Sequence, residues 1–362
     1  MTIPSAEPAM VSEIIASRVD AALAGGVVES RRLSMARASI DMRVEQDVAP
    51  CILTPFAHLQ TRGGDGHATL HVDVAALRER DAEALDLDGL PDNGVVISDG
   101  DRIVHLHRHT AAVLDRAAGR IRALVRNTNG VASWYRAKPL QLPLSIFFAD
   151  RGVDLLHGGL VSLQGNGVLI AGTGGSGKST LTLASLLEGL DFLGDDCVAA
   201  QEIEGRFEGH SVFGSSCLEH AHLRRFPLLG GTGADDVEAK AVLPIAQLFA
   251  DRMASSTTIR AIVLPRVTHG DQVTLQPTSG REALLALAPS SILGRAVPAA
   301  GALARMARLV REIPAFRLEM GPVDEAGPRM RALLEELRRQ RWLPKAPPGS
   351  PQEPFLPRRL LE

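Results

Sequence analysis

The feature that most constrains this chain is a glycine-rich loop between a short apolar run and a helical pattern. Residues 172–179 read Gly-Thr-Gly-Gly-Ser-Gly-Lys-Ser, which matches the G-x-x-x-x-G-K-[ST] pattern of a P-loop. The β-branched run at 168–171 predicts a buried strand before the loop, and leucines at helical spacing within 179–190 predict a helix after it. A glycine turn without a ligand is the alternative, but the order strand, loop, helix favours a phosphate-binding loop.

Each residue type in the loop has a chemical reason. Glycines let the backbone bend tightly so that several N–H groups meet phosphate oxygens, and the start of a helix favours an anion. Lys178 can reach the β- and γ-phosphates of a nucleotide, and the Ser179 hydroxyl suits Mg²⁺. Lysine occurs at only four positions in a chain with 39 Lys plus Arg, and one of them is this position. We therefore assign nucleotide binding to Gly172, Thr173, Gly174, Gly175, Ser176, Gly177, Lys178, Ser179 and Thr180.

Two adjacent carboxylates follow the predicted P-loop helix. In the run Leu190–Val198, a short apolar stretch at 192–194 comes directly before Asp195 and Asp196, so the pair is expected at the end of a strand. One carboxylate there can hold Mg²⁺ and a second can accept a hydroxyl proton. An ordinary Asp-rich turn is the alternative, which the neighbouring P-loop makes the weaker one.

A hairpin is predicted immediately before the P-loop. Gln164-Gly165-Asn166-Gly167 separates two apolar runs, and Asn-Gly is a hairpin signal. The strand that feeds the P-loop then has an antiparallel neighbour, which predicts a mixed sheet. His157 precedes the hairpin at the end from which the P-loop leaves, so it is placed either on the phosphate side or at a structural or surface position.

These features together resemble the catalytic half of bacterial HPr kinase/phosphorylase: His157-Gly158, the hairpin, Gly172 to Ser179, and Gly194-Asp195-Asp196. The run 192–196 is also similar to the second kinase motif of phosphoenolpyruvate carboxykinase, which shares that nucleotide-binding fold. The specific resemblance covers residues 157–198, with a looser likeness to residue 337.

The resemblance implies a serine kinase that uses ATP and Mg²⁺ to phosphorylate a hydroxyl of a protein or peptide. It makes Asp195, Asp196, His157 and Lys178 the catalytic set and Ser179 and Asp195 the metal ligands, with one aspartate acting as the base. The family's Glu-Arg-Gly segment has no clear counterpart in 202–223, and its Pro-Gly-Arg-Asn segment is not recognisable near residues 294–295. The sequence therefore indicates a relative of HPr kinase and not its namesake.

Composition excludes several classes. A net charge of −3, a pI of about 6.4 and 4% aromatic residues argue against nucleic-acid binding. No apolar run is long enough to span a membrane, the N-terminus does not look like a signal peptide, and three sparse cysteines favour a reducing compartment. We expect a cytoplasmic protein, with a homo-oligomer left open.

We expect an α/β protein, with a P-loop kinase core whose mixed sheet is of the HPr kinase type and a smaller β-rich domain before it. The chain then divides into four segments. Residues 1–40 are an N-terminal helical segment, 41–140 a β-rich domain that recognises the substrate, 141–342 the P-loop catalytic domain, and 343–362 a disordered Pro-rich tail. Strands are expected at 51–53, 69–72, and in a hairpin around Asp99-Gly100. His105, His107 and His109 alternate there, which suggests a solvated strand face or, less often, a metal triad. Arg266, just past an expected strand, is a candidate γ-phosphate contact.

Three functions remain open. A kinase that acts on a protein or peptide hydroxyl is the first, an ATP-binding regulatory module without an acceptor is the second, and a kinase of a small molecule such as free serine is the third. The chain lacks the Asn-Lys-x-Asp motif of GTPases and the Leu-Ser-Gly-Gly-Gln signature of transporter ATPases, so those two classes are disfavoured.

Overall fold

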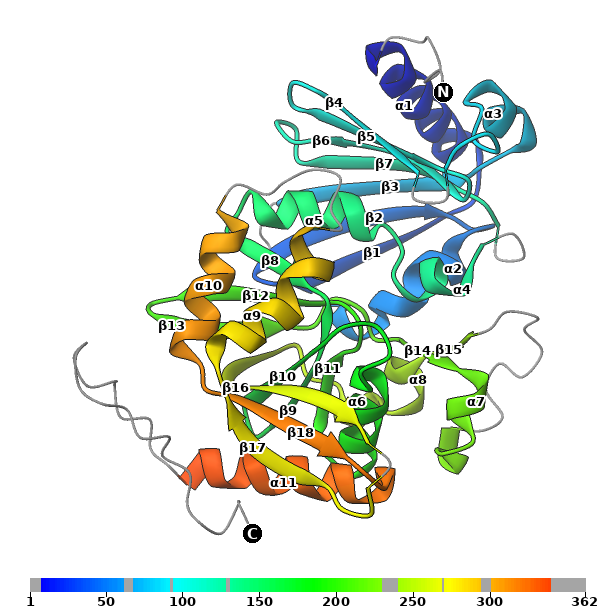
Figure 1. Cartoon of the computed structure of the whole chain (residues 1–362). Helices are drawn as coiled ribbons and strands as arrows, with labels where there is room; N and C mark the ends of the chain where they lie inside the picture. Colours follow the sequence, from blue (N-terminus) through cyan, green and yellow to red (C-terminus); the bar gives the residue numbers. More distant parts are fainter. Residues whose placement is uncertain are drawn as a thin grey trace.

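Two large β-sheets lie beside each other, each with helices on its faces (Figure 1). The computed structural model describes residues 8–61, 68–91, 94–127, 131–229, 240–268, 270–293 and 301–339. The first sheet has seven strands from the N-terminal part of the chain, and the second has nine strands from the part after residue 150. The predicted α/β class, with a mixed sheet around the P-loop segment, is therefore confirmed.

The seven-stranded sheet contains the predicted hairpin. Its strands are β1 (Val28–Met35), β2 (Ala38–Glu45), β3 (Leu70–Ala76), β4 (Val95–Asp99), β5 (Arg102–His107), β6 (Thr110–Asp115) and β7 (Arg120–Val125). Their spatial order is β1-β2-β3-β7-β6-β5-β4, and β3 is parallel to both of its neighbours. β4 and β5 pair on either side of residues 100 and 101, which confirms the hairpin around Asp99-Gly100.

Two predictions for the N-terminal part are wrong. Residues 51–53, predicted as a strand, belong to helix α2 (Ala49–Leu53), which has proline in its first turn where a missing N–H is tolerated. Residues 1–40 are not only helical, because β1 and the start of β2 follow helix α1 (Pro8–Gly25). The turn between these strands, Ala36-Arg37, has positive φ at both residues but no Gly or Asn, so it gives no hairpin signal in the sequence.

Helix α1 covers one face of the seven-stranded sheet. Its apolar side chains Val11, Ile15 and Val19 recur every four residues and are buried against residues of β3, β5, β6 and β7. The helix α3 (Glu79–Ala84) packs into the same cluster through its buried Ala82.

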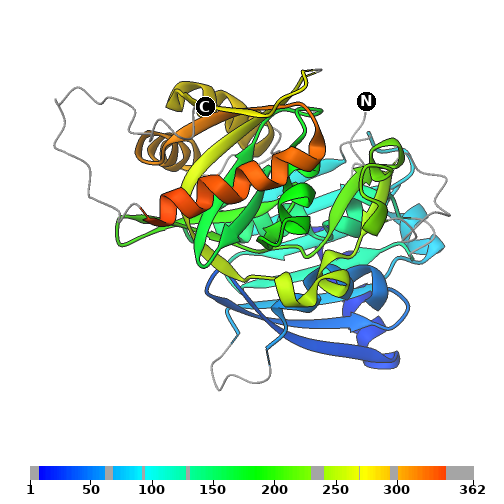
Figure 2. The same ribbon diagram turned by 90° about the horizontal axis from the view of Figure 1, so that it is seen from below.

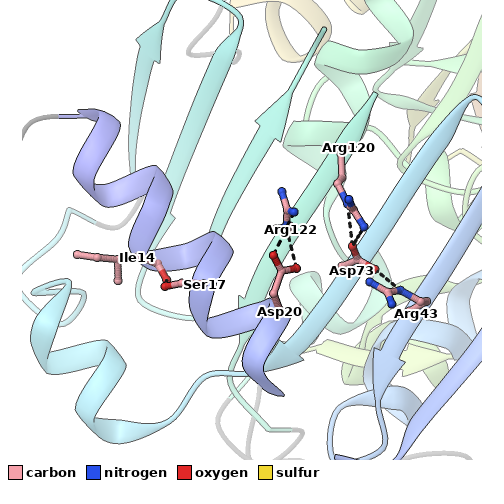
Figure 3. A network of polar contacts seen from close by, with 7 residues as sticks. All are labelled: Ile14, Ser17, Asp20, Arg43, Asp73, Arg120 and Arg122. Atoms are coloured by element: carbon pink, nitrogen blue, oxygen red, sulfur yellow. Dashed lines mark hydrogen bonds and ion pairs between the residues drawn. The ribbon is translucent and has the colours of Figure 1, made fainter. Parts of the chain in front are cut away.

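A ladder of charged side chains occupies the same face next to α1 (Figure 3). Asp73 on β3 accepts hydrogen bonds from Arg43 on β2 and Arg120 on β7, and its side chain is almost fully buried. Asp20 of α1 accepts two hydrogen bonds from Arg122. The buried carboxylate is thus paired across both neighbouring strands, which a buried charge requires.

The opposite face of the seven-stranded sheet is part of one hydrophobic core with the C-terminal half. This core joins the sheet to α5 (Gln141–Ala149), α4 (Ser133–Ala137) and residues around Phe213. Phe56, in the 3₁₀ turn after α2, meets Phe213 with ring centroids 5.3 Å apart. The His58 ring and the Ser211 hydroxyl are hydrogen-bonded at 2.6 Å beside them. The division of the chain into a β-rich and a catalytic domain remains a proposal.

The nine-stranded sheet is mixed, as predicted. Its strands are β8 (Val153–Leu156), β9 (Gly158–Leu163), β10 (Asn166–Ala171), β11 (Asp191–Gly194), β12 (Val198–Ile203), β13 (Arg206–His210), β16 (Ser256–Val267), β17 (Thr274–Thr278) and β18 (Ala315–Met320). The strand order is β11-β9-β10-β16-β13-β12-β8. In addition, β18 pairs with residues 262–267 of β16, and β17 pairs with β18. β16 continues through Pro265, where we expected it to end.

Helices cover both faces of this sheet, in agreement with the alternation along β10. Val168 and Ile170 face α6 (Lys178–Leu187) and α11 (Val323–Arg339), whereas Leu169 and Ala171 face α9 (Gly280–Ala288) and α10 (Ala302–Glu312). In the view from below, α11 crosses in front of the strands (Figure 2).

The hairpin of β9 and β10 is confirmed, but its turn lies two residues earlier than Asn166-Gly167. Leu163 pairs with Asn166, so Gln164 and Gly165 form the turn, and both have positive φ. That is the geometry of a type I′ turn, which matches the twist of the two strands.

The segment between β13 and β16, which both belong to the nine-stranded sheet, contains further short elements. They are β14 (Ser216–Glu219), α7 (His220–Leu223), β15 (Lys240–Leu243) and α8 (Ile245–Leu248). β14 and β15 form a separate antiparallel pair. In the described ranges, no helix has the length and apolar character needed to cross a membrane. The predicted Pro-rich tail, 343–362, lies outside the described residues.

The shared core predicts that the two sheets unfold together. Phe213→Ala should lower the free energy of unfolding by about 3–5 kcal/mol, because Phe213 is fully buried between them. Chemical denaturation followed by circular dichroism measures this, with Leu228→Ala at an 81% exposed position as the control. Two separate transitions, with only one of them moved by Phe213→Ala, would contradict a common core.

Candidate active site

Strand pairing brings the predicted site residues to one edge of the nine-stranded sheet. β10 and β11 both run antiparallel to β9, so the ends of β10 and β11 lie beside the start of β9. The P-loop follows β10, the aspartate pair follows β11, and His157 directly precedes β9. Three segments that are separate in sequence therefore meet at this edge.

The loop between β10 and α6 has the backbone that its glycines predict. Gly175 and Gly177 have φ of 76° and 100°, in the left-handed region that favours glycine. A Cβ on Gly177 would also lie 2.2 Å from Cε of Met320, on β18. The ammonium of Lys178, the first residue of α6, donates to the Thr173 carbonyl at 3.0 Å and so crosses the loop.

Asp195 is buried and incompletely paired. The Ser216 hydroxyl, in β14, donates to its Oδ2 at 2.6 Å, and the Ser179 hydroxyl lies beside the same carboxyl group. Its Oδ1 has no hydrogen-bond partner by strict geometry within the described chain. Burial, and then the charge of Asp196, raises the pKa of Asp195 to about 6.

Asp196 has the opposite environment. Its carboxylate accepts a hydrogen bond from the Lys138 ammonium and lies 2.8 Å from Nδ1 of His157. Burial alone would raise the pKa of Asp196, but Lys138 and then His157 outweigh it, so the pKa lies well below its ordinary range. The residue has a φ of 67°, a left-handed conformation that Asp tolerates better than most side chains. Asp196 is therefore held as a carboxylate at neutral pH.

Lys138 is a site residue that the sequence reasoning did not assign. It follows α4, outside the predicted catalytic range 141–342, yet it is deeply buried against Asp196. Burial lowers the pKa of Lys138, but Asp196 more than offsets this, and the net pKa is raised. The scarcity of lysine was a usable signal, because two of only four lysines, Lys138 and Lys178, lie at this site.

Two adjacent serines connect the segment that carries Lys138 to the aspartate pair. Ser215 donates to the carbonyl of Ala137, next to Lys138, at 2.5 Å, and Ser216 donates to Asp195. Both serines are buried. The segment before β14 thus fixes the relative positions of Lys138 and the aspartate pair.

A pocket of about 520 Å³ lies beside the P-loop. It is lined by residues 172–176 of the loop, by residues 264–267 at the end of β16, and by Arg317 on β18. Arg266, the expected cation past the strand, is therefore beside the loop, and Arg317 is a second arginine there that the sequence reasoning missed. Arg317 pairs with Glu282 at 2.7 Å.

The residues at this edge fit Mg²⁺. Ser179 offers a hydroxyl and Asp195 a carboxylate with one oxygen unpaired, and Mg²⁺ is usually bound by one or two carboxylates together with substrate phosphates. Within the described ranges, no group of three or more His, Cys, Asp or Glu residues is placed to hold a metal by itself.

The three histidines of the first sheet form neither of the arrangements predicted for them. His107 is buried, and its ring packs edge-on against Trp134 with centroids 5.3 Å apart. Burial, and then His107, lowers the pKa of His105 to about 4. His105 and His107 thus lie in the wall of a cavity, and His109 is half-buried, so the row is not a solvated face.

The site thus combines a P-loop-like turn, a buried Asp195 beside a partly buried Asp196, and a mixed sheet, an arrangement typical of P-loop phosphotransferases. The chain is 43% identical to HPr kinase/phosphorylase of Clostridium tetani (strain Massachusetts / E88) over 61 residues, 17% of this chain and 20% of that protein. The match therefore spans about a fifth of the relative's length. It confirms a relationship to the HPr kinase family over that segment.

A structural comparison gives a weaker likeness. The structure of the Hpr(Ser) kinase/phosphatase from Coxiella burnetii matches with 15% identity and a TM-score of 0.30, over 51% of this chain and 97% of that one. No protein-family model matches the chain.

The loop geometry predicts a graded response to alanine. Gly174→Ala should change the free energy of unfolding by less than about 0.5 kcal/mol, because it has open space and an ordinary φ. Gly175→Ala should cost about 1–2 kcal/mol from its left-handed backbone, and Gly177→Ala more, because Met320 must also move. Denaturant titrations of the three variants test this order, and equal values would contradict it.

The burial of Asp195 predicts that Asp195→Asn stabilises the protein without ligands. The folded pKa of about 6 exceeds the ordinary 3.8, so the ionised carboxyl opposes folding above pH 6 and the effect disappears below about pH 4. The variant should gain on the order of 1–3 kcal/mol at pH 7.5 and less at pH 5. Unfolding titrations at both pH values measure this, with Asp251→Asn, 82% exposed, as control. A loss of stability at pH 7.5 would refute the assignment.

Proposed function

We propose that this protein is an ATP- and Mg²⁺-dependent kinase that transfers the γ-phosphoryl group to a hydroxyl. The observation that supports this most is the unlike environment of two adjacent carboxylates beside the P-loop. Asp196 is held ionised by Lys138 and His157, whereas Asp195 is buried next to Ser179 with one oxygen unpaired. Neighbouring acids with different pKa values suit two different roles.

Each group then has one task. The backbone of residues 172–180 and the Lys178 ammonium bind the phosphates, and Ser179 and Asp195 are the residues that would hold the metal. Mg²⁺, when bound, neutralises charge on the β- and γ-phosphates. Asp196 accepts a hydrogen bond from the acceptor hydroxyl and orients its oxygen, and His157 and Lys138 keep that carboxylate in place.

The phosphoryl transfer needs no reactant besides ATP, the acceptor hydroxyl and the Asp196 carboxylate. The acceptor oxygen forms a bond to the γ-phosphorus as the bond from that phosphorus to the bridging oxygen of ADP breaks. The electron pair leaves with ADP, and the hydroxyl proton passes to Asp196. Little covalent work is required of the protein, because phosphoryl transfer depends mainly on positioning and charge stabilisation.

The acceptor and the setting are further parts of the proposal. The similarity to HPr kinase/phosphorylase makes a protein or peptide hydroxyl one candidate, and a small-molecule hydroxyl is the other. We place the protein in the cytoplasm, where ATP is available and its three free cysteines stay reduced. We assign residues 41–140 to substrate recognition and 141–342 to catalysis.

Replacing the orienting carboxylate should separate transfer from binding. Asp196→Asn should lower kcat for transfer by about 100-fold or more, because the amide cannot take the proton, while the Kd for ATP changes by less than about threefold. Lys178→Met should instead weaken ATP binding. Transfer from γ-labelled ATP and calorimetric ATP titration measure the two effects, with Asp251→Asn as the control carboxylate.

The same two measurements distinguish a kinase from an ATP-binding regulatory module. A nucleotide-binding module without an acceptor would bind ATP with no transfer in either the wild type or Asp196→Asn. Label that leaves ATP only to water, in both proteins and with every acceptor offered, would contradict the kinase proposal.

A further inference from the structure

A second cavity, of about 800 Å³, lies between the two sheets and is lined in part by two residues that contact Asp196. The first sheet contributes Val96, His105, His107, Thr110 and Ala112. The linking segment contributes residues from Trp134 to Ser145, including Lys138. The second sheet and the turn after α9 contribute Leu155 to His157 and Ser290-Ser291. The P-loop pocket has a different set of lining residues, so this is a separate space.

Two of the lining residues are the groups that hold Asp196. Lys138 and His157 both line the cavity, and both contact the Asp196 carboxylate. The backbone N–H of His157 donates to the Ser291 hydroxyl of the same wall at 2.9 Å. The P-loop residue Lys178 lies within electrostatic reach of Asp196 as well. The carboxylate thus lies close both to the phosphate loop and to the cavity.

The remaining wall combines apolar residues, such as Leu140, Leu155 and Leu156, with polar residues. It presents the imidazoles of His105 and His107, the hydroxyls of Thr110 and Tyr135, the Gln141 amide and the Trp134 indole. The depressed pKa of His105, about 4, keeps that ring neutral at physiological pH. Among the described lining residues there is no Asp, Glu or Arg, and the one lysine, Lys138, is already paired with Asp196. A charged ligand would find no counter-ion here, which disfavours it.

The shape suits a small molecule. Most of the wall is interior, since His107, Tyr135 and Leu155 are each less than 5% exposed. The volume falls within the range of about 300–1,000 Å³ that is usual for small-molecule sites. A loop of a folded protein would need a broad exposed face around the contact. This space is bounded on several sides by both sheets and by α4 and α5, with the exposed Trp134 and Ser290 also in its wall.

We propose that this cavity binds the phosphate acceptor, and that the acceptor is an uncharged small molecule with a hydroxyl group. The inference rests on the proposed kinase function and specifies its substrate class. The hydroxyl end of the molecule lies at Lys138 and His157, within reach of Asp196, and its body lies against Trp134 and the histidines. The hydroxyl oxygen takes the γ-phosphoryl group, ADP leaves, and the proton passes to Asp196, giving a phosphate monoester.

Two adjacent residues of β4 give a matched pair of variants. Val96 lines the cavity, whereas its neighbour Ile97 faces the core under α1, and both are half-buried. Val96→Trp should fill part of the cavity and raise KM for the acceptor at least tenfold, with KM for ATP unchanged. Ile97→Trp should change neither constant by more than about twofold, because it leaves the cavity as it is.

The assay uses γ-labelled ATP and pairs of probes that differ in charge: glycerol and glycerate, N-acetylserine amide and N-acetylserine, uridine and uridine monophosphate. We expect label in at least one neutral probe and at least tenfold less label in its charged partner. In Val96→Trp, this difference between the neutral and the charged probe should disappear. Equal labelling of charged and neutral partners, or an acceptor KM that Val96→Trp leaves unchanged, would overturn the proposal.

Other outcomes separate this inference from the kinase proposal. Label that enters only added proteins overturns the small-molecule acceptor but leaves the kinase standing. ATP binding that Lys178→Met abolishes, without label in any probe, overturns the acceptor site while nucleotide binding remains. Absence of any ATP binding by the wild-type chain removes both.

Discussion

The site depends on the different environments of two adjacent carboxylates. Asp195 and Asp196 follow one short buried strand, and two like charges so close need different partners. Lys138 and His157 stabilise the charge on Asp196, whereas Asp195 lies between serine hydroxyls and keeps one oxygen without a partner in the described chain. The pair is therefore divided into one carboxylate that is ionised at neutral pH in the resting protein and one whose charge is costly until a cation approaches.

The N-terminal sheet packs against the segments that carry the site residues. Its inner face shares a core with the helices that end just before and begin just after Lys138, and with residues that precede the Asp195 partner Ser216. Ser215 fixes the backbone beside Lys138 from the other side. The cavity lined by Lys138 and His157 also takes residues from the first sheet, which that core joins to the second.

Local sequence was sufficient where local chemistry determines the structure. The P-loop, its strand and helix, the hairpin before it and the aspartate pair were all predicted, because glycine, Asn-Gly and apolar periodicity act over a few residues. The meeting of His157 with Asp196 required only the antiparallel pairing of β9 with β10 and β11. Lys138 and Arg317 were missed because contacts between distant segments leave no local pattern. The β1–β2 hairpin was missed because its turn residues, Ala36 and Arg37, have the positive φ that usually indicates glycine, although neither is glycine.

The central claim is that a nucleotide bound by the P-loop presents its terminal phosphate to this divided pair. A crystal structure with Mg²⁺ and a non-hydrolysable ATP analogue tests it directly. The account predicts the triphosphate along residues 172–180, the metal at Ser179 and Asp195, and Asp196 still joined to Lys138 and His157 with its free edge toward the γ-phosphate. A triphosphate bound elsewhere, or a metal held by Asp196 with Lys138 displaced, would contradict it.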